Sequence, residues 1–356
     1  MTAPELVPDI APARPVAENV PPVPEPAAVP ASHPRAGAAL RGSPAYVGVR
    51  ACALARCGDI RRAYRHFLDG DAEGLHDVRV GLRRLRSWLR AFQPWVDDTF
   101  RKKTRRALRS LARATSDARD AEVAAEWVAS QTDFADRERS GVRTALARLE
   151  RERDDETHTV RRRLAADLPS LLDALEKDLE LHRDHLPHPA GSMDEAAWPV
   201  LQELAARLMQ ALEHVTDSSA LEPAHRARIA SKRLRYVLEP LHEPGEARAQ
   251  LAPLIQLQDL VGAARDAHVL ARKYVKEVGE TAAQDARERA LVSIGVREKP
   301  RHRSSARLRV GLIALAKRAH AVEAESFAEF QRLWAPEPAA HTIEALIAPF
   351  RPGTTA

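Results

Sequence analysis

The sequence predicts an all-α protein built from two similar helical halves. The 356-residue chain is rich in Ala, Leu, Arg and Glu and has only 15 glycines, a mix that favours helices. Apolar residues recur at helical spacing along most of the chain, and no segment shows the alternation typical of a strand. Two ordered segments of the first half recur in the second. We therefore expect two pseudo-symmetric antiparallel bundles of about four long helices each, forming one compact unit.

The ends of the chain have a different composition from its middle. Residues 1–43 are rich in Pro and Ala, which predicts a disordered tail with polyproline II character. The helical domain is expected at 45–335, with halves at 45–188 and 192–334. Residues 336–356 are again rich in Pro and are interpreted as a second tail, although the piece IEALIAPF could pack.

Helix-breaking residues set the expected ends of the helices in the first half. Asp69-Gly70-Asp71 ends the first helix and Pro94 ends the second. The charged segment before the linker predicts one very long helix, or two helices broken at Pro169. The expected ranges are 45–68, 74–93, 97–115, 119–130 and 136–183.

The second half begins after a linker at 185–192. Ser192 and Glu195 have the spacing of a capping box, which predicts a helix start at Ser192. A basic segment with Pro300 predicts a loop at 293–303. The expected helices are 194–216, 222–242, 246–261, 264–284 and 304–334.

One helix, expected at 74–93, carries a concentrated positive charge. At about 100° per residue, one face is apolar and the opposite face is basic. Like charges at this spacing repel by about 0.2–0.5 kcal/mol per pair, so an anionic partner is expected to offset the repulsion. We call the basic face the first stripe: His76, Arg79, Arg83, Arg86 and Arg90.

The same pattern returns 149 positions later. We call this the second stripe: His225, Arg228, Lys232 and Arg235. Arg84 and Arg233 also match between the halves, whereas Glu239 stands where the first half has Arg90. Farther along, the pair Arg119-Asp120 matches Arg265-Asp266. Two such halves packed face to face would bring both stripes close to a pseudo-twofold axis.

At these residues the sequence resembles the CHAD family, the conserved histidine α-helical domain. The signature H-x2-R-x3-R-R-L-R spans His76–Arg86, and H-x2-R-x3-K-R-L-R spans His225–Arg235. The resemblance implies two pseudo-symmetric four-helix units that bind inorganic polyphosphate on a basic central surface without catalysis. The E-x-E-x-K signature of a triphosphate-tunnel (CYTH) domain does not occur, so a stand-alone CHAD protein is expected.

The expected polyphosphate ligands are the two stripes and their neighbours. Arginine forks can bind phosphate oxygens in pairs, and both histidines lie near helix starts, where backbone N–H groups also favour anions. Asp120 and Asp266 are interpreted as acceptors that orient an arginine or cap a helix start. The main set is His76, Arg79, Arg83, Arg84, Arg86, Arg90, His225, Arg228, Lys232, Arg233 and Arg235; a weaker set is Lys102, Arg106, Arg109, Arg113, Arg119 and Arg265.

The basic residues also permit two other functions. A nucleic-acid backbone binder would use the same cations, but only Trp88 and Tyr236 lie beside the stripes as stacking platforms. A polyphosphate-processing enzyme would need a phosphate loop or carboxylates for Mg²⁺, and neither occurs on the stripes, so no catalysis is expected. His182, His185 and His188 could form a metal site, but Pro187 and Pro189 predict a loop there without fixed ligand geometry, so neither a metal nor a cofactor is expected.

Composition also bears on the compartment. The N-terminus lacks the basic and apolar regions of a secretion signal, and no run of about 18 apolar residues occurs, so we expect a soluble cytoplasmic protein without membrane contact. Cys52 and Cys57 are interpreted as buried thiols. A net charge of +5 is modest for this length, so the placement of the charge matters more than its sum. Association with polyphosphate granules, and a scaffold role there, would follow from the ligand alone.

Overall fold

A computed structural model describes residues 36–71, 73–96, 102–181, 191–216, 220–300 and 305–353. Within these ranges all regular elements are helices, and the one β-bridge joins Pro44 to Ser192. The all-α prediction is therefore confirmed. No helix in the described part of the chain is both long and apolar enough to cross a membrane.

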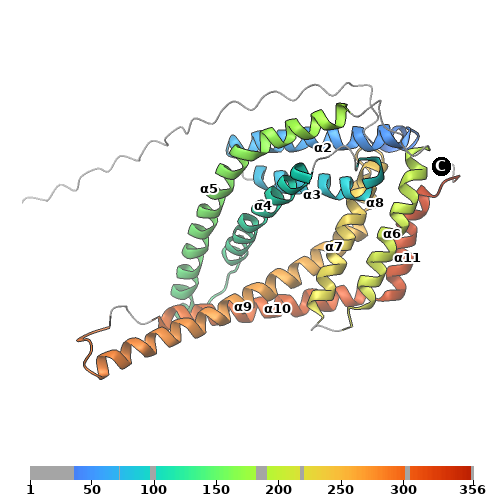
Figure 1. Cartoon of the computed structure of the whole chain (residues 1–356). Coiled ribbons are helices and arrows are strands. Elements are labelled where there is room, and N and C mark those ends of the chain that lie inside the picture. Colours follow the sequence, from blue (N-terminus) through green and yellow to red (C-terminus); the bar gives the residue numbers. More distant parts are fainter. Residues whose placement is uncertain are drawn as a thin grey trace, which may run out of the picture.

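Four helices form the first half. Their bounds are α2 Ala45–Leu68, α3 Gly74–Ala91, α4 Lys102–Ala129 and α5 Asp136–Leu181. In Figure 1, α4 and the first part of α5 run side by side as one arm, and the rest of α5 turns to lie along α2. α5 continues through Pro169 without a break, which selects the first of the two predicted alternatives.

The prediction of separate helices at 97–115 and 119–130 was wrong, because α4 is continuous. The stretch between them contains Thr115 and Ser116, whose hydroxyls both donate to the Ala112 carbonyl within the helix, each at 3.1 Å. Such side-chain bonds allow polar residues to continue a helix instead of ending it. The Arg119-Asp120 pair consequently lies inside α4, where it cannot cap a helix start.

The second half repeats this order. It contains α6 Met193–Glu213, α7 Leu221–Leu238, the short α8 Ala247–Gln250, α9 Ala252–Ser293 and α10 Ala306–Leu333. The capping box is confirmed: Glu195 N donates to Ser192 Oγ at 3.3 Å, and Ser192 N donates to Glu195 Oε2 at 2.7 Å. The split predicted between 261 and 264 was wrong, because α9 runs through Gly262.

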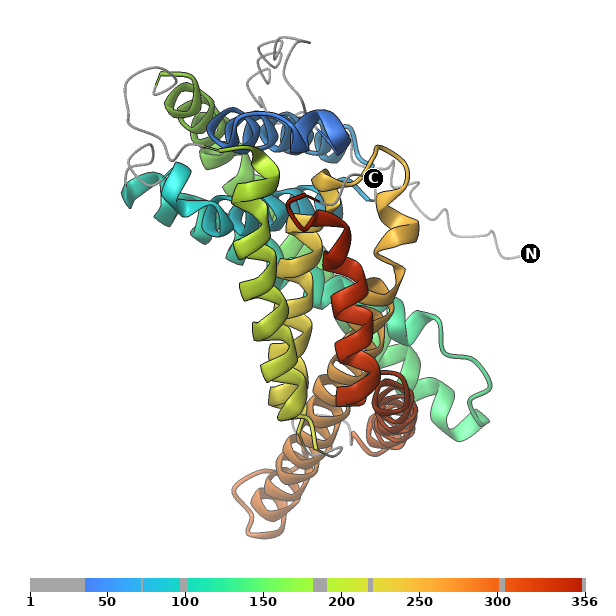
Figure 2. The same ribbon diagram turned by 90° about the vertical axis from the view of Figure 1, so that its right-hand side faces the viewer.

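Both segments interpreted as tails contain helix in their described parts. α1 Gly37–Arg41 precedes α2, and its Arg41 pairs with Asp194 at 2.9 Å. α11 Pro336–Ile347 packs along α6, as Figure 2 shows, and buries Ile343 and Ile347. The prolines at the start of α11 occupy positions whose N–H groups need no helical partner, so they do not prevent the helix.

The neighbour relations agree between the halves. α2 packs on α3 as α6 packs on α7, and α4 packs on α5 as α9 packs on α10. α11 packs on α6 as the later part of α5 packs on α2. The single long helix α5 of the first half thus corresponds to two helices, α10 and α11, of the second half. A pseudo-twofold axis relating the halves stays a prediction.

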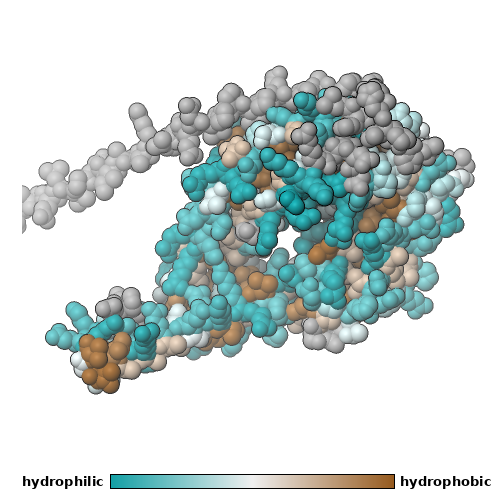
Figure 3. Space-filling model, viewed as in Figure 1, coloured by the Kyte–Doolittle hydropathy of each residue, from teal (hydrophilic) through white to brown (hydrophobic). Residues whose placement is uncertain are grey.

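Two apolar clusters hold the helices together. The larger contains residues of both halves, including Cys52, Cys57 and Trp88 from the first and Leu234 from the second. Both cysteines are free and buried, as predicted. The smaller cluster fills the space between the arms α4–α5 and α9–α10. Figure 3 shows a brown patch at the far end of the α9–α10 arm. Ile294 and Val296, just after the end of α9, are 71% and 63% exposed.

The arms meet at a glycine contact between α5 and α10. A Cβ on Gly141 would lie 2.8 Å from the Cα of Gly311, and a Cβ on Gly311 would collide with the backbone nitrogen of Val142. Because the obstructing atoms belong to the backbone, no side chain can move aside to relieve the overlap. The two helices can approach this closely only because both positions are glycine.

The Gly311→Ala change is therefore expected to destabilise the protein by about 1–3 kcal/mol, because the arms must separate. The matched control is Gly279→Ala on the exposed face of α9, where no atom lies within 4 Å of the added Cβ. That change should stabilise the protein by about 0.5–1 kcal/mol through helix propensity. Chemical unfolding of both variants measures the difference, and equal effects would contradict the backbone contact.

Candidate functional site

The helices α3 and α7 are brought together by their apolar faces. Leu82 and Leu85 of α3 and Leu234 and Val237 of α7 are fully buried in the larger cluster. This burial fixes the orientation of both helices, so their basic faces point away from the core. The prediction for the apolar face of each helix is confirmed.

Residues of both stripes line one groove of about 1140 Å³, which we call the central groove, whereas His76, Arg79 and Arg235 are not in its lining. α3, α4, α6 and α7 contribute to its walls. From the expected main set, the lining contains Arg83, Arg86, Arg90, His225, Arg228, Lys232 and Arg233. The stripes therefore face each other across a shared space instead of lying on separate surfaces.

The cations of the two halves influence one another across the groove. The pKa of Lys232 is lowered to about 6, first by burial and then by Arg228, Arg83 and Arg79. Burial also lowers the pKa of Arg233, with further lowering by Arg90 of the opposite stripe. Lys232 is consequently a neutral amine at pH 7, whereas the arginines stay protonated.

Several buried nitrogens near the groove have no hydrogen-bond partner among the described residues. Arg79 Nε and Arg83 Nε are buried without a hydrogen-bond partner among the described residues, and so are His76 Nδ1 and His225 Nδ1. Each such buried polar atom costs about 1–3 kcal/mol when it remains unpaired. Burial is the main cause that lowers the pKa of both histidines, followed by Arg79 for His76 and Arg265 for His225.

Glu239 holds the crossing of α3 and α7 at one edge of the site. It begins the short 3₁₀ helix Glu239–Leu241, and it accepts hydrogen bonds from Arg84 Nε at 2.8 Å and Arg84 Nη2 at 3.2 Å. Arg235 Nε lies 3.7 Å from the same carboxylate, and both guanidinium groups lie over the Tyr236 ring. The structure thus places Arg84, which the sequence grouped with the ligands, in an ion pair outside the groove lining.

The two Arg-Asp pairs support the stripes from α4 and α9. Burial lowers the pKa of Arg79 and of Arg228. The carboxylate of Asp120 counteracts this lowering at Arg79, and the carboxylate of Asp266 does so at Arg228. Burial raises the pKa of Asp266, against the lowering effect of the surrounding cations. Of the two interpretations offered for these aspartates, the placement favours orientation of an arginine.

Arg119 and Arg265, from the weaker set, are both engaged by carboxylates. Arg119 pairs with Glu122 at 2.6 Å and with Glu126 at 3.4 Å. Arg265 lies 3.8 Å from Glu222 of α7. Arg119 is therefore paired within its own helix, whereas Arg265 links α9 to α7, and neither lines the central groove.

Gly262 makes room for Arg228. The Nε of Arg228 donates to the Gln258 carbonyl at 2.9 Å, and a Cβ on Gly262 would lie 2.9 Å from Arg228 Nη2. The Gln258 amide in turn donates to Ser231 Oγ at 2.7 Å. The backbone of α9 thereby fixes the guanidinium of α7, an arrangement that sequence spacing did not indicate.

Among the weaker-set cations on α4, only Arg109 lines the central groove. Arg109 lines it, together with Arg105, whereas Lys102, Arg106 and Arg113 are exposed elsewhere on the helix. Arg207 of α6 also lines the groove and pairs with Glu203. The sequence analysis missed Arg105 and Arg207. The spacing of Arg105 and Arg109, four residues apart, could have indicated the first of them.

The aromatic residues beside the stripes belong to the core. Trp88 is fully buried and donates Nε1–H to the Val49 carbonyl at 2.9 Å, and Tyr236 is 2% exposed. Neither ring is available for stacking on a base. Trp95, in the 3₁₀ helix Gln93–Trp95, is half-buried and contributes to the groove wall.

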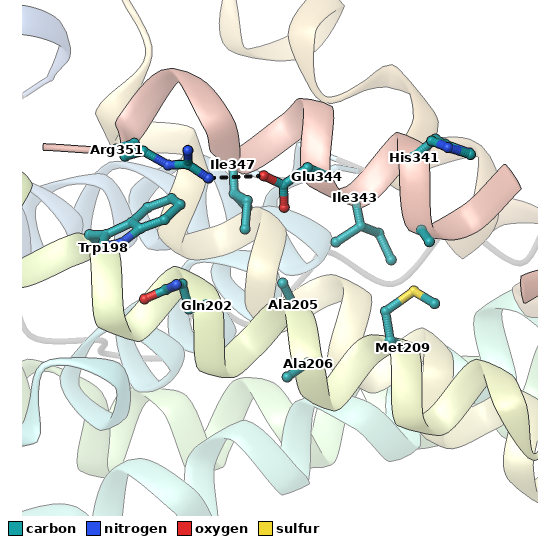
Figure 4. A pocket seen from close by; sticks show the side chains of 11 residues that line it. Trp198, Gln202, Ala205, Ala206, Met209, His341, Ile343, Glu344, Ile347 and Arg351 are labelled. Carbon is teal, nitrogen blue, oxygen red and sulfur yellow. Dashed lines mark hydrogen bonds and ion pairs between the residues drawn. The ribbon is translucent and has the colours of Figure 1, made fainter. Parts of the chain in front are cut away.

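A second cavity, of about 510 Å³, lies between α6 and α11 (Figure 4). Trp198, Met209 and Ile343 give it apolar walls, and its Arg351 donates to Glu344 at 3.3 Å. The guanidinium of this cavity is therefore already paired with a carboxylate. His182, His185 and His188 lie outside the described residues. Within the described ranges, no group of three or more His, Cys, Asp or Glu side chains is placed to hold a metal ion.

Comparison with known proteins identifies the family. The CHAD domain pattern matches residues 52–275, more than half of the chain, and the protein belongs to the CHAD family. The crystal structure of the CHAD domain from the plant Ricinus communis is similar, with a TM-score of 0.54 at 20% identity, over 86% of this chain and 93% of that one. PptA from Streptomyces chartreusis gives a TM-score of 0.54 at 16% identity, over 84% and 99%. A search of curated protein sequences found no match.

The lowered pKa of Lys232 predicts a specific pH dependence of stability. The unfolded chain keeps a proton on this lysine up to its ordinary pKa of 10.5, whereas the folded chain releases it near pH 6. Between these values the unfolded state binds more protons, so this group makes the free energy of unfolding rise with pH. Lys232→Met should therefore be more stable than the wild type at pH 7, by a margin that shrinks toward pH 9.

Thermal unfolding in chloride buffer at pH 7, 8 and 9 measures this margin. The exposed Lys317 of α10 provides the control, and Lys317→Met should show a constant difference from the wild type. A margin for Lys232→Met that does not change with pH would show that the lysine keeps its proton in the folded protein.

Proposed function

We propose that this protein binds inorganic polyphosphate in the central groove without transforming it. The observation that carries the proposal is that cations of both stripes line one groove, in which buried nitrogens of Arg83 and His225 have no hydrogen-bond partner among the described residues. Membership of the CHAD family and the implied ligand of that family point to the same chemistry.

The chemistry of the groove suits a chain of phosphates. Polyphosphate has an anionic oxygen on every unit and no bases, so it requires successive cations and no stacking surface. Arginine binds such oxygens through charge-assisted, paired hydrogen bonds. Arg83, Arg86 and Arg90 lie along α3 at spacings of about one turn, and Arg228 and Arg233 face them from α7. A bound chain would contact both halves at once.

Polyphosphate would also remove the electrostatic strain of the site. Its negative charge would offset the repulsion among the stripes and raise the pKa of Lys232, so that the lysine takes up a proton on binding. Arg84 is left out of the proposed ligands because Glu239 already neutralises it. Arg105 and Arg207 are added because they line the groove.

The combined change of Arg79, Arg83 and Arg86 to Ala tests the proposal. Each lost charge-assisted contact is worth about 1.5–3 kcal/mol, so affinity for long-chain polyphosphate should fall by roughly 100-fold or more while the helical content stays the same. Calorimetric titration and circular dichroism measure these two quantities. The same triple change of Arg228, Lys232 and Arg235 asks whether the second half contributes.

A matched control removes three cations elsewhere. Arg137, Arg143 and Arg151 are exposed on α5 and do not line the groove. Their joint replacement by Ala lowers the net charge equally and should change affinity by less than about threefold at physiological salt. If both triple variants lose affinity equally, binding depends on net charge and the groove is not the site.

Nucleic-acid backbone binding is the alternative that the same cations permit. The groove offers few stacking platforms, because Trp88 and Tyr236 are buried and only Trp95 is half-buried among the aromatic residues described beside it, whereas single-strand binders gain affinity from several stacked aromatics. We expect long-chain polyphosphate to displace single-stranded RNA at equal phosphate concentration. Polyphosphate incubated with the protein and Mg²⁺ should keep its chain length on gels, and shortening would reveal an enzyme.

A further inference from the structure

Lys232 occupies an unusual chemical position in the central groove. It lies on α7 and lines the groove, and no described residue accepts a hydrogen bond from its amine. Its ammonium form would meet mainly positive charge. The charged and titratable groups that act on it or feel its charge are Arg228, Arg235 and His225 of α7, Arg79 and Arg83 of α3, and Asp266 of α9.

This environment makes Lys232 a nucleophile at neutral pH. With a pKa of about 6, Lys232 carries a free amine in most molecules at pH 7. An ordinary lysine has only about one free amine in a thousand molecules at that pH. Only the unprotonated amine has the lone pair that attacks a carbonyl carbon.

The groove also provides an anchor for a small phosphorylated reagent. Arg83 and Arg228 line the same space as Lys232, and their guanidinium groups are suited to hold a phosphoryl group beside the amine. Binding of this kind raises the local concentration of the reagent at the nucleophile. A neutral acyl donor without phosphate would gain nothing from these arginines.

We propose that Lys232 is a site of covalent acylation by small acyl phosphates, of which acetyl phosphate is the simplest. The lone pair of Nζ attacks the acyl carbon, and a C–N bond forms. The bond between that carbon and the phosphate oxygen breaks, and inorganic phosphate leaves with the electron pair. The nitrogen gives one proton to water, and the product is N-acetyl-lysine; no oxidant or reductant is needed.

A consequence for the ligand rests on the proposed polyphosphate function. Acylation fixes Lys232 as a neutral amide, so the side chain can no longer gain a proton when a polyanion binds. The added acyl group also fills part of the groove between the stripes. Acylation should therefore weaken polyphosphate binding, and bound polyphosphate should protect Lys232.

The experiment uses the full chain without polyphosphate. Acetyl phosphate is added at pH 7, 8 and 9, and mass spectrometry of proteolytic peptides follows acetylation at each lysine with time. Lys177 and Lys317 are exposed and serve as internal references. At pH 7, Lys232 should react about tenfold or more faster than either reference. Its rate should stay nearly constant to pH 9, whereas the reference rates should rise by about tenfold per pH unit.

Two further comparisons test the anchor. At pH 9, where the Lys232 amine is free even if the loss of Arg83 raises its pKa, Arg83→Gln should slow acetylation by acetyl phosphate more than acetylation by p-nitrophenyl acetate, which carries no phosphate. Equal slowing with both reagents would overturn the phosphate anchor. A Lys232 rate in the wild type that is no faster than those of the references, and that rises with pH as theirs do, would overturn the proposal as a whole.

Adding long-chain polyphosphate separates this proposal from the proposed function. Protection of Lys232, with unchanged rates at Lys177 and Lys317, supports both. Fast acetylation that polyphosphate does not slow would count against polyphosphate binding in the groove and leave the acylation site standing.

Discussion

The crossing of α3 and α7 is the constraint on which the rest of the structure depends. Two helices with strongly basic faces lie close enough for Arg79 and Arg83 of one to lower the pKa of Lys232 on the other. Electrostatics alone would drive them apart. The fully buried leucines on their apolar faces oppose this repulsion, because turning either helix away would expose them to water. The basic groove thus lies on the outer side of the apolar contact between α3 and α7.

Polar contacts at the crossing add orientation to this packing. Arg56 of α2 is 7% exposed, donates to the Tyr236 carbonyl at 2.7 Å and lies over the Trp88 ring, so it links three helices from both halves. Glu239 binds Arg84 across the crossing and lies near Arg235. A buried or half-buried guanidinium with a fixed acceptor resists rotation of its helix. The remaining groove cations therefore keep their direction although they repel one another.

The two halves are similar in order but unequal in charge. Glu239 occupies the place of Arg90, and it brings a carboxylate to the second half where the first half has a cation. α4 contributes Arg105 and Arg109 to the groove, whereas α9 contributes support through Gln258, Gly262 and Asp266. Among the cations of the groove, the first half supplies only arginines, and the second adds Lys232 beside its own arginines. Lys232 meets arginines of both halves, because Arg79 and Arg83 of α3 and Arg228 of α7 all lower its pKa.

The sequence by itself determined the helical class, the two copies of the basic signature and the apolar face of each signature helix. These features depend on local periodicity, which a helix imposes wherever it lies. It could not determine that Lys102–Ala129 is one helix with an unbroken Arg119-Asp120, because Thr115 and Ser116 are equally suited to a cap or an interior turn. Only the tertiary structure decided which cations share a space. Arg84 turns to Glu239 and Arg207 joins from α6 because helix packing, not spacing along one helix, sets the distances between side chains of different elements.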